Sequence, residues 1–162
     1  MGKNKLTINV IKKANYQSYK KTFLTRDEYF GNEYWMIKFK TVEDIPEILK
    51  NQPIASGVET PKKNILDILF ADKAFKNYEK CRQIIQVEKI FNQGNDSTKK
   101  EFIVKLLSDR NIFVLLEYNF FLLAEQIFNL NYTILVNKIT PDTSPVLFMN
   151  EDIKMIIMPI KE

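Results

Sequence analysis

The sequence predicts an α+β fold, in which a mostly antiparallel sheet built from N- and C-terminal strands packs against a central helical region. Apolar and polar residues alternate near both ends of the chain, whereas the middle carries helix-start signals and a helical apolar face. Only four glycines and six prolines occur in 162 residues, which indicates regular elements joined by short loops. The length and the 45% hydrophobic content fit one globular domain over residues 1–162.

The N-terminal strands are predicted from alternation of apolar and polar side chains with a period of two residues. This pattern predicts a first strand over residues 5–12. We expect further strands over residues 19–24 and 35–39, with a turn at Gly31-Asn32 between them.

The middle of the chain carries several helix signals. Asp44 and Glu47 form a capping box that predicts a short helix through Asn51. Proline at the first helical position predicts the start of another helix at Thr60-Pro61. The predicted helices cover residues 44–51, residues 60–94 with their stop signal at Gly94, residues 98–107 and the nearly all-apolar residues 112–130.

The C-terminal part is predicted to return to strands. Residues 132–136 have the composition of a buried strand, and residues 146–149 and 153–158 indicate a hairpin. The two ends of the chain are therefore expected to be neighbours in one sheet.

Positive charge is concentrated at the N-terminus. Residues 1–26 hold seven Lys and Arg and no acidic residue, whereas residues 27–162 hold 17 basic and 20 acidic residues. A concentrated positive field attracts anionic surfaces. Lysine outnumbers arginine 21 to 3, a ratio that an AT-rich coding sequence would also produce, so the charge indicates an anionic partner without identifying it.

The inventory of reactive residues argues against an enzyme. The chain has no histidine, which is the commonest general base and zinc ligand, and its four glycines are too far apart for a phosphate-binding loop. The one cysteine, Cys81, is predicted to be a buried apolar residue rather than a reactive thiol. No catalytic, metal-binding or cofactor-binding residue is therefore predicted.

A metal-dependent nuclease is the one enzymatic exception that the sequence suggests. Asp142 and Asp152, with Lys154 two residues later, resemble the PD-(D/E)xK nuclease pattern, in which two acids hold a divalent metal. The predicted hairpin separates the two aspartates by more than about 10 Å, which is too far for ligands of one ion. We therefore interpret Asp152 as a turn residue and Lys154 as an exposed strand lysine.

The cellular location is predicted from what the sequence lacks. It has no secretory signal, and the most apolar segment, residues 112–123, is interrupted by Glu117 and Asn119 and is too short to span a bilayer. A single cysteine suits a reducing compartment. We expect a cytoplasmic protein with no membrane partner.

The preferred functional hypothesis is a non-enzymatic protein that acts through protein–protein contact, such as a phage or mobile-element virion or assembly component, or an inhibitor of a host enzyme. Lysines between Lys12 and Lys40 would steer an acidic protein partner, and nearby tyrosines would supply buried contact area. The predicted partner-binding residues are Lys12, Lys13, Tyr16, Tyr19, Lys20, Lys21, Tyr29, Tyr34, Lys38 and Lys40.

The alternative hypothesis is sequence-tolerant nucleic-acid binding. On a sheet, Tyr34, Met36 and Lys38 would share a solvent-exposed face that tracks phosphates and stacks bases. This hypothesis uses Lys5, Lys20, Lys21, Lys38 and Lys40. With only three arginines in the chain, specific base readout is not expected.

Overall fold

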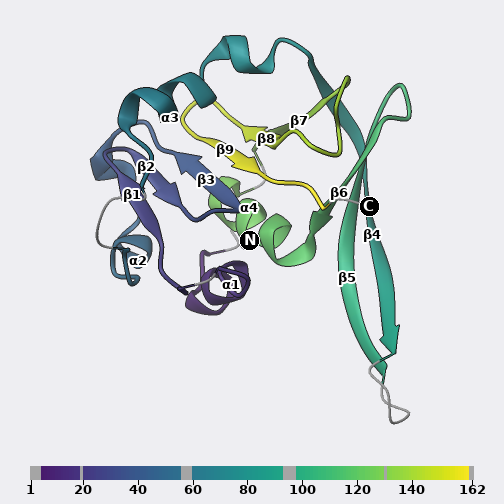
Figure 1. The fold of residues 1–162 in the computed structure, drawn as a ribbon, viewed down its shortest axis with the longest axis horizontal. Helices are drawn as coiled ribbons and strands as arrows, with labels where there is room; N and C mark the ends of the chain where they lie inside the picture. The colour runs from purple at the N-terminus through teal and green to yellow at the C-terminus, as the bar shows by residue number, and fades with distance from the viewer. Residues whose placement is uncertain (1–4, 19, 56–59, 93–97, 130, 161–162) are drawn as a thin grey trace.

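The computed structural model of the chain describes residues 5–18, 20–55, 60–92, 98–129 and 131–160, and only the backbone between residues 89 and 100. Over these residues, nine strands form an antiparallel sheet in the order β1-β2-β3-β9-β8-β7-β4-β5-β6 (Figure 1). The strands are β1 (Leu24–Arg26), β2 (Tyr29–Gly31), β3 (Trp35–Lys38), β4 (Tyr78–Asn92), β5 (Thr98–Ser108), β6 (Phe113–Glu117), β7 (Thr133–Asn137), β8 (Val146–Met149) and β9 (Lys154–Ile157). The helices are α1 (Ile8–Ala14), α2 (Glu47–Lys50), α3 (Lys63–Leu69) and α4 (Tyr118–Phe128), with 3-10 turns η1 (Val42–Asp44) and η2 (Asp72–Phe75). The predicted α+β class is confirmed.

The N- and C-terminal strands meet in this sheet, as predicted. β3 pairs with β9, with Trp35 opposite Ile157 and Lys38 opposite Lys154. After β9, the backbone N–H of Ile160 donates to the carbonyl of Leu115 in β6 at 2.8 Å. The sheet therefore curls until the chain that follows β9 meets β6, the last strand in the order.

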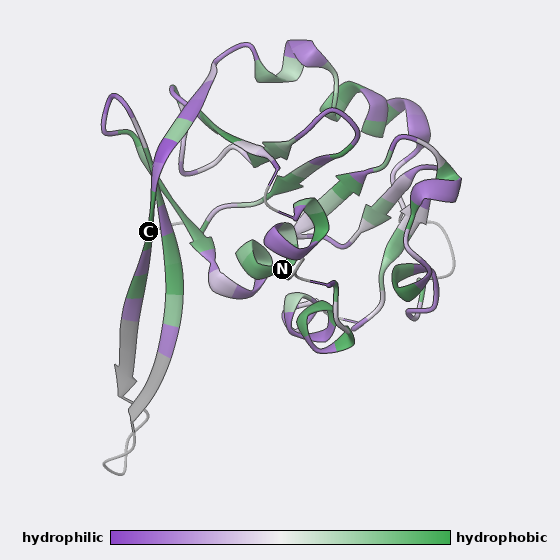
Figure 2. Cartoon of the chain, turned by 180° about the vertical axis from the view of Figure 1, so that it is seen from behind, coloured by the Kyte–Doolittle hydropathy of each residue, from purple (hydrophilic) through white to green (hydrophobic). Residues whose placement is uncertain are grey.

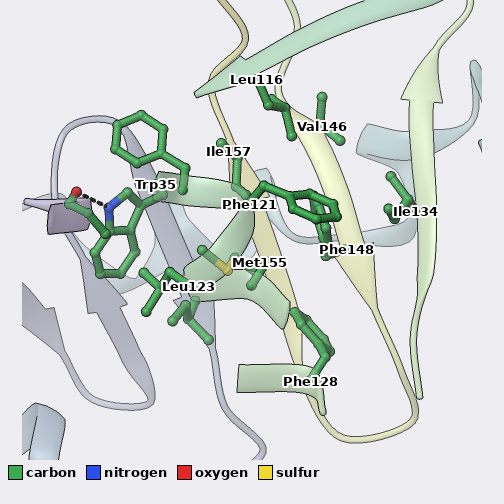
Figure 3. Packing of buried hydrophobic residues seen from close by; sticks show 14 of the residues in the cluster. Trp35, Leu116, Phe121, Leu123, Phe128, Ile134, Val146, Phe148, Met155 and Ile157 are labelled. Carbon is green, nitrogen blue, oxygen red and sulfur yellow. Dashed lines mark hydrogen bonds between the residues drawn. The ribbon is translucent and has the colours of Figure 1, made fainter. Parts of the chain in front are cut away.

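The main core lies inside this curl, around α4. Phe121, Leu123 and Phe128 of α4 lie near Phe148 of β8 and Met155 of β9 (Figure 3). All five side chains are buried. The prediction of a core helix is confirmed for this part of the most apolar segment, because a helix that is apolar nearly all round needs burial on every side.

A second, smaller cluster covers the opposite face of β2 and β3. Tyr29 and Met36 pack there against Leu66 of α3 and Phe70 just after it. The neighbouring residue in β2, Phe30, belongs to the main core. These two strands are therefore buried on both faces, which explains why their apolar residues run on continuously rather than alternate.

Residues 5–12 form a helix over most of their length, so the predicted first strand is wrong. The hydroxyl oxygen of Thr7 accepts a hydrogen bond from the N–H of Val10 at 3.3 Å and caps α1. Ile11 and Ala14, three residues apart, are the buried positions of this helix, which packs on α4. The apolar alternation is short enough to fit either structure, and packing decides between them.

The two longest strands replace predicted helices. The segment that forms β4 is predicted to be helical because Tyr78, Cys81 and Ile85 have a helical spacing. That spacing is a coincidence, since the segment is a strand. β5 replaces the helix predicted over residues 98–107. The two strands pair along their length, with Ile84 opposite Leu106, and this non-local pairing outweighs the local helix signals.

The remaining boundaries follow the sequence more closely. The strand predicted over residues 19–24 begins only at Leu24, and the predicted helix over residues 112–130 divides into β6 and α4. Tyr19 lies outside the described residues. The strands predicted over residues 35–39 and 132–136 and the hairpin of residues 146–149 and 153–158 are confirmed as β3, β7, β8 and β9. α2 and α3 lie within segments predicted to be helical.

Candidate functional site

The structure changes the role of the tyrosines predicted to contact a partner. Tyr29 is fully buried, and its hydroxyl donates a hydrogen bond to Asp67 at 2.5 Å. The prediction that Tyr29 contacts a partner is therefore wrong, because α3 covers that face of β2. Tyr34 is half-buried, with its ring stacked on Phe120 at 5.9 Å between centroids. Tyr16 is exposed.

Most of the predicted lysines lie at the surface. Lys12 and Lys13 of α1 and Lys20, Lys21 and Lys40 are exposed. Lys40 forms an ion pair with Asp152 at 3.9 Å, and both side chains are largely exposed, so the pair contributes little stability. Lys38 is half-buried, with its ammonium 5.9 Å from the ring centroid of Tyr29.

The sheet face predicted for nucleic-acid binding is covered. Met36 is buried beneath Leu66 and Phe70, and Lys38 on the same strand is half-buried. Residues 5–12, predicted to extend this face, are mostly helical. The sheet face predicted to bind nucleic acid is therefore not exposed, whereas Lys5, Lys20, Lys21 and Lys40 are exposed.

The nuclease-like residues are engaged in other contacts. The ammonium of Lys154 donates to the carbonyl of Phe70 at 3.2 Å and to Asp72 at 3.3 Å. Asp152 pairs with Lys40. Within the described part of the chain, no three His, Cys, Asp or Glu side chains are grouped so as to hold a metal ion.

The most prominent surface feature is a long hairpin, which we call the arm and define as β4 from Gln83 onward together with β5. β4 pairs with β7 only over Tyr78, Glu79 and Lys80. A bulge at Cys81/Gln83 follows, and from there the described part of β4 pairs with β5 alone. The arm projects away from the rest of the molecule (Figure 1). β4 therefore presents an open edge along the arm.

The register determines which backbone groups face this open edge. The N–H of Ser108 donates to the carbonyl of Ile112 at 3.0 Å, so even-numbered residues of β5 point their backbone groups toward β6. Odd-numbered residues of β5 then bond to β4, including Lys105, which lies opposite Ile85. The backbone groups of Ile84 and Gln86 consequently face away from β5. They are the first accessible ladder positions of the open edge.

The arm also carries exposed apolar side chains. Ile84 is 46% exposed and Phe102 is 40% exposed. Both strands of the arm carry short runs of apolar residues, such as residues 84–85 and 102–104 (Figure 2). Val104 and Leu106 of β5 are buried in the main core, whereas Ile84 and Phe102 remain at the surface. The exposed apolar side chains therefore indicate a contact surface.

A depression lies at the fork where β4 leaves β7. It has a volume of about 420 Å³, and its walls include Lys80, Arg82 and Ile84 from β4 and Thr133 from β7. Arg82 forms an ion pair with Asp109 at 2.9 Å across the bases of the two arm strands. Burial raises the pKa of the Cys81 thiol, so the group is kept in its unreactive protonated form.

The N-terminal helix approaches the arm at its base. The hydroxyl of Tyr16 donates to Glu117 at 2.9 Å, and the amide of Gln17 donates to the same carboxylate at 3.1 Å. Although the Tyr16 side chain is partly exposed, its partial desolvation, followed by the hydrogen bond to Glu117, raises the pKa of Tyr16 to about 12. Sequence reasoning missed Glu117 because the pairing spans about a hundred residues and leaves no local pattern.

Comparisons with known proteins identified no relative of the chain. A scan of protein-family models found no match for the chain, and searches of curated proteins and of solved structures found none either. Among the described residues, no helix is long and apolar enough to cross a membrane. The candidate site therefore rests on the geometry of the arm and its base.

Proposed function

We propose that the protein acts without catalysis, by binding another protein through the open edge of β4 in the arm. The observation that carries this proposal is the parting of β4 from β7 after Lys80, which leaves the backbone groups of Ile84 and Gln86 without a neighbouring strand among the described residues. A partner that contributes a strand completes the ladder there.

Strand addition suits the physical state of the arm. At Ile84 and Gln86, β4 is the outer strand next to β5, which pairs with β6 on its other side. A strand added at this edge would contribute backbone hydrogen bonds and side-chain burial. The exposed side chain of Ile84 supplies apolar contact area beside the edge. Backbone pairing gives affinity, and the side chains around the fork give selectivity.

The basic N-terminal region remains part of the proposed surface. α1 carries the exposed Lys12 and Lys13, and Tyr16 joins its end to the base of the arm through Glu117. These lysines would steer a partner with an acidic surface toward the arm and raise the rate of association. The proposal includes a cytoplasmic location, in which the Cys81 thiol stays reduced, and an assembly or inhibitory role in a phage or mobile element.

Site-specific photo-cross-linking in the cell of origin tests the proposal. A benzoylphenylalanine placed at Ile84 is expected to give one discrete cross-linked protein, identified by mass spectrometry. The matched control position is Ile68 on α3, which is 69% exposed but lies away from the arm. A product at Ile68 and none at Ile84 would overturn the proposal, as would no product at either position.

A further inference from the structure

A second depression lies at the base of the arm, between the end of α1 and the start of α4. It has a volume of about 420 Å³. Its walls combine aromatic rings and charged groups, namely Lys13, Tyr16, Glu101, Phe102, Glu117 and Tyr118. An open site that brings three aromatic residues together with two carboxylates has the chemistry that recognises organic cations.

Two of the aromatic rings form adjoining walls. Phe102 and Tyr118 lie 5.7 Å apart between centroids, with their planes inclined at 56°. Phe102 is 40% exposed although it is wholly apolar. The negative potential above the face of an aromatic ring attracts a cation, and the exposed ring of Phe102 can offer such a face.

The carboxylate of Glu117 is held in place within the depression. One of its oxygens accepts from the hydroxyl of Tyr16 and the other from the amide of Gln17. Each oxygen has a second lone-pair site, so the carboxylate retains capacity to accept from a cationic donor. The charged residues that line the depression are Glu101, Glu117 and Lys13, and Glu117 is the carboxylate whose contacts leave it able to accept from a cation.

We propose that this depression binds the cationic side chain of an arginine or lysine from a protein partner, against the exposed ring of Phe102 and next to the carboxylate of Glu117. The proposal does not depend on strand addition at the edge of β4, because no described residue of β4 lines the depression. It predicts a basic residue at this point of a partner whose wider surface is acidic.

The direct test is a titration of the full-length ¹⁵N-labelled protein with N-acetyl-arginine methylamide, followed by NMR. The expected result is saturable shift changes at the amides of Phe102, Glu117 and Tyr118. The matched probe is N-acetyl-citrulline methylamide, which has nearly the same shape without the charge. Equal shifts with both probes would overturn the proposal, and so would linear, non-saturating shifts with the arginine probe.

A substitution at Phe102 tests whether the aromatic ring contributes to binding. Phe102→Leu keeps an apolar side chain but removes the ring, and we expect about tenfold weaker binding of the arginine probe. The control is Phe113→Leu on β6, where Phe113 is 44% exposed and already lies beneath the ammonium of Lys105 at 4.6 Å. Binding weakened equally by both variants would contradict the proposed position.

Removing the charge of Lys13 is expected to change the binding affinity in the opposite direction. Lys13 lines the depression and repels a cation, so Lys13→Gln is expected to tighten binding about threefold. Lys12→Gln on the same helix serves as the control and is expected to have a smaller effect, because Lys12 does not line the depression. Weaker binding by the Lys13→Gln variant would show that a positive charge at this position favours the probe, and it would contradict the proposed cation site.

Discussion

The indole N–H of Trp35 donates a hydrogen bond to the carbonyl of Ala14 at 2.9 Å, which joins β3 to the last residue of α1 (Figure 3). The buried amide of Asn32 strengthens the same junction by donating to Asn15 at 2.8 Å. These contacts hold the end of the N-terminal helix against the β2–β3 turn. They explain how a segment with strand-like alternation is held as a helix on the body of the protein.

Replacing Trp35 with phenylalanine should loosen this junction. The variant removes the donor to Ala14 and leaves a small cavity, so we expect the free energy of unfolding in urea to fall by about 2 kcal/mol. Hydrogen exchange should also quicken at the α1 amides. The control is Phe30→Leu, which removes volume from the same core without this hydrogen bond; equal quickening of α1 exchange in both variants would contradict the role of the indole.

Gly31 is required at the β2–β3 turn because no side chain fits there. A Cβ atom would lie 2.2 Å from the carbonyl oxygen of Trp35 and 2.7 Å from the Cα of Met36. Both are backbone atoms, so a rotamer change cannot relieve the clash. Gly31→Ala is expected to lower the free energy of unfolding by about 2 kcal/mol or more; a variant as stable as the parent in urea denaturation would show that this turn is placed incorrectly.

Tyr16 makes stability depend on pH at the alkaline end. Its pKa rises from 10.0 to about 12 on folding, because burial and Glu117 favour the neutral hydroxyl. The unfolded chain therefore releases its proton first, so this contribution is complete below pH 10 and is lost between pH 10 and 12. The difference in unfolding free energy between the parent and Tyr16→Phe should shrink or reverse sign across that window, and a constant difference would contradict the Tyr16–Glu117 contact.

Two proline substitutions test the direction of the backbone groups in the arm. Val87 lies opposite Ile103, and its amide faces β5, so Val87→Pro should quicken hydrogen exchange at the β5 amides. Gln86→Pro should leave this exchange nearly unchanged, because the amide of Gln86 faces the open edge. Similar exchange in the two variants would refute the proposed register of the edge.

The sequence predicted the fold class and the parts of the sheet that depend on local patterns. The apolar run from Trp35 to Phe39 and the C-terminal hairpin are visible locally, and both are present as β3 and as β8 with β9. α4 was predicted from a run of apolar residues, although not its boundary with β6. These segments could be predicted because their pattern and their burial agree.

The arm could not be predicted, because its signals compete. Ile84, Ile85 and Val87 favour a strand through β-branching, but the wider spacing of apolar residues favours a helix. Pairing of β4 with β5 resolves the conflict, and no local rule contains that information. The burial of Tyr29 and the contact of Tyr16 with Glu117 depend in the same way on elements distant in the sequence.

The most direct test of the central proposal is a binding measurement with the Gln86→Pro variant of the full chain. It compares the affinity of this variant and of the parent for the partner identified by cross-linking at Ile84. Removing one outward-facing N–H and placing a proline ring at the edge should weaken binding about tenfold or more. The control Gln86→Thr keeps the amide, so it should bind nearly as the parent does. Unchanged affinity in Gln86→Pro would contradict strand addition at β4, and an equal loss in both variants would assign the contact to the glutamine side chain instead.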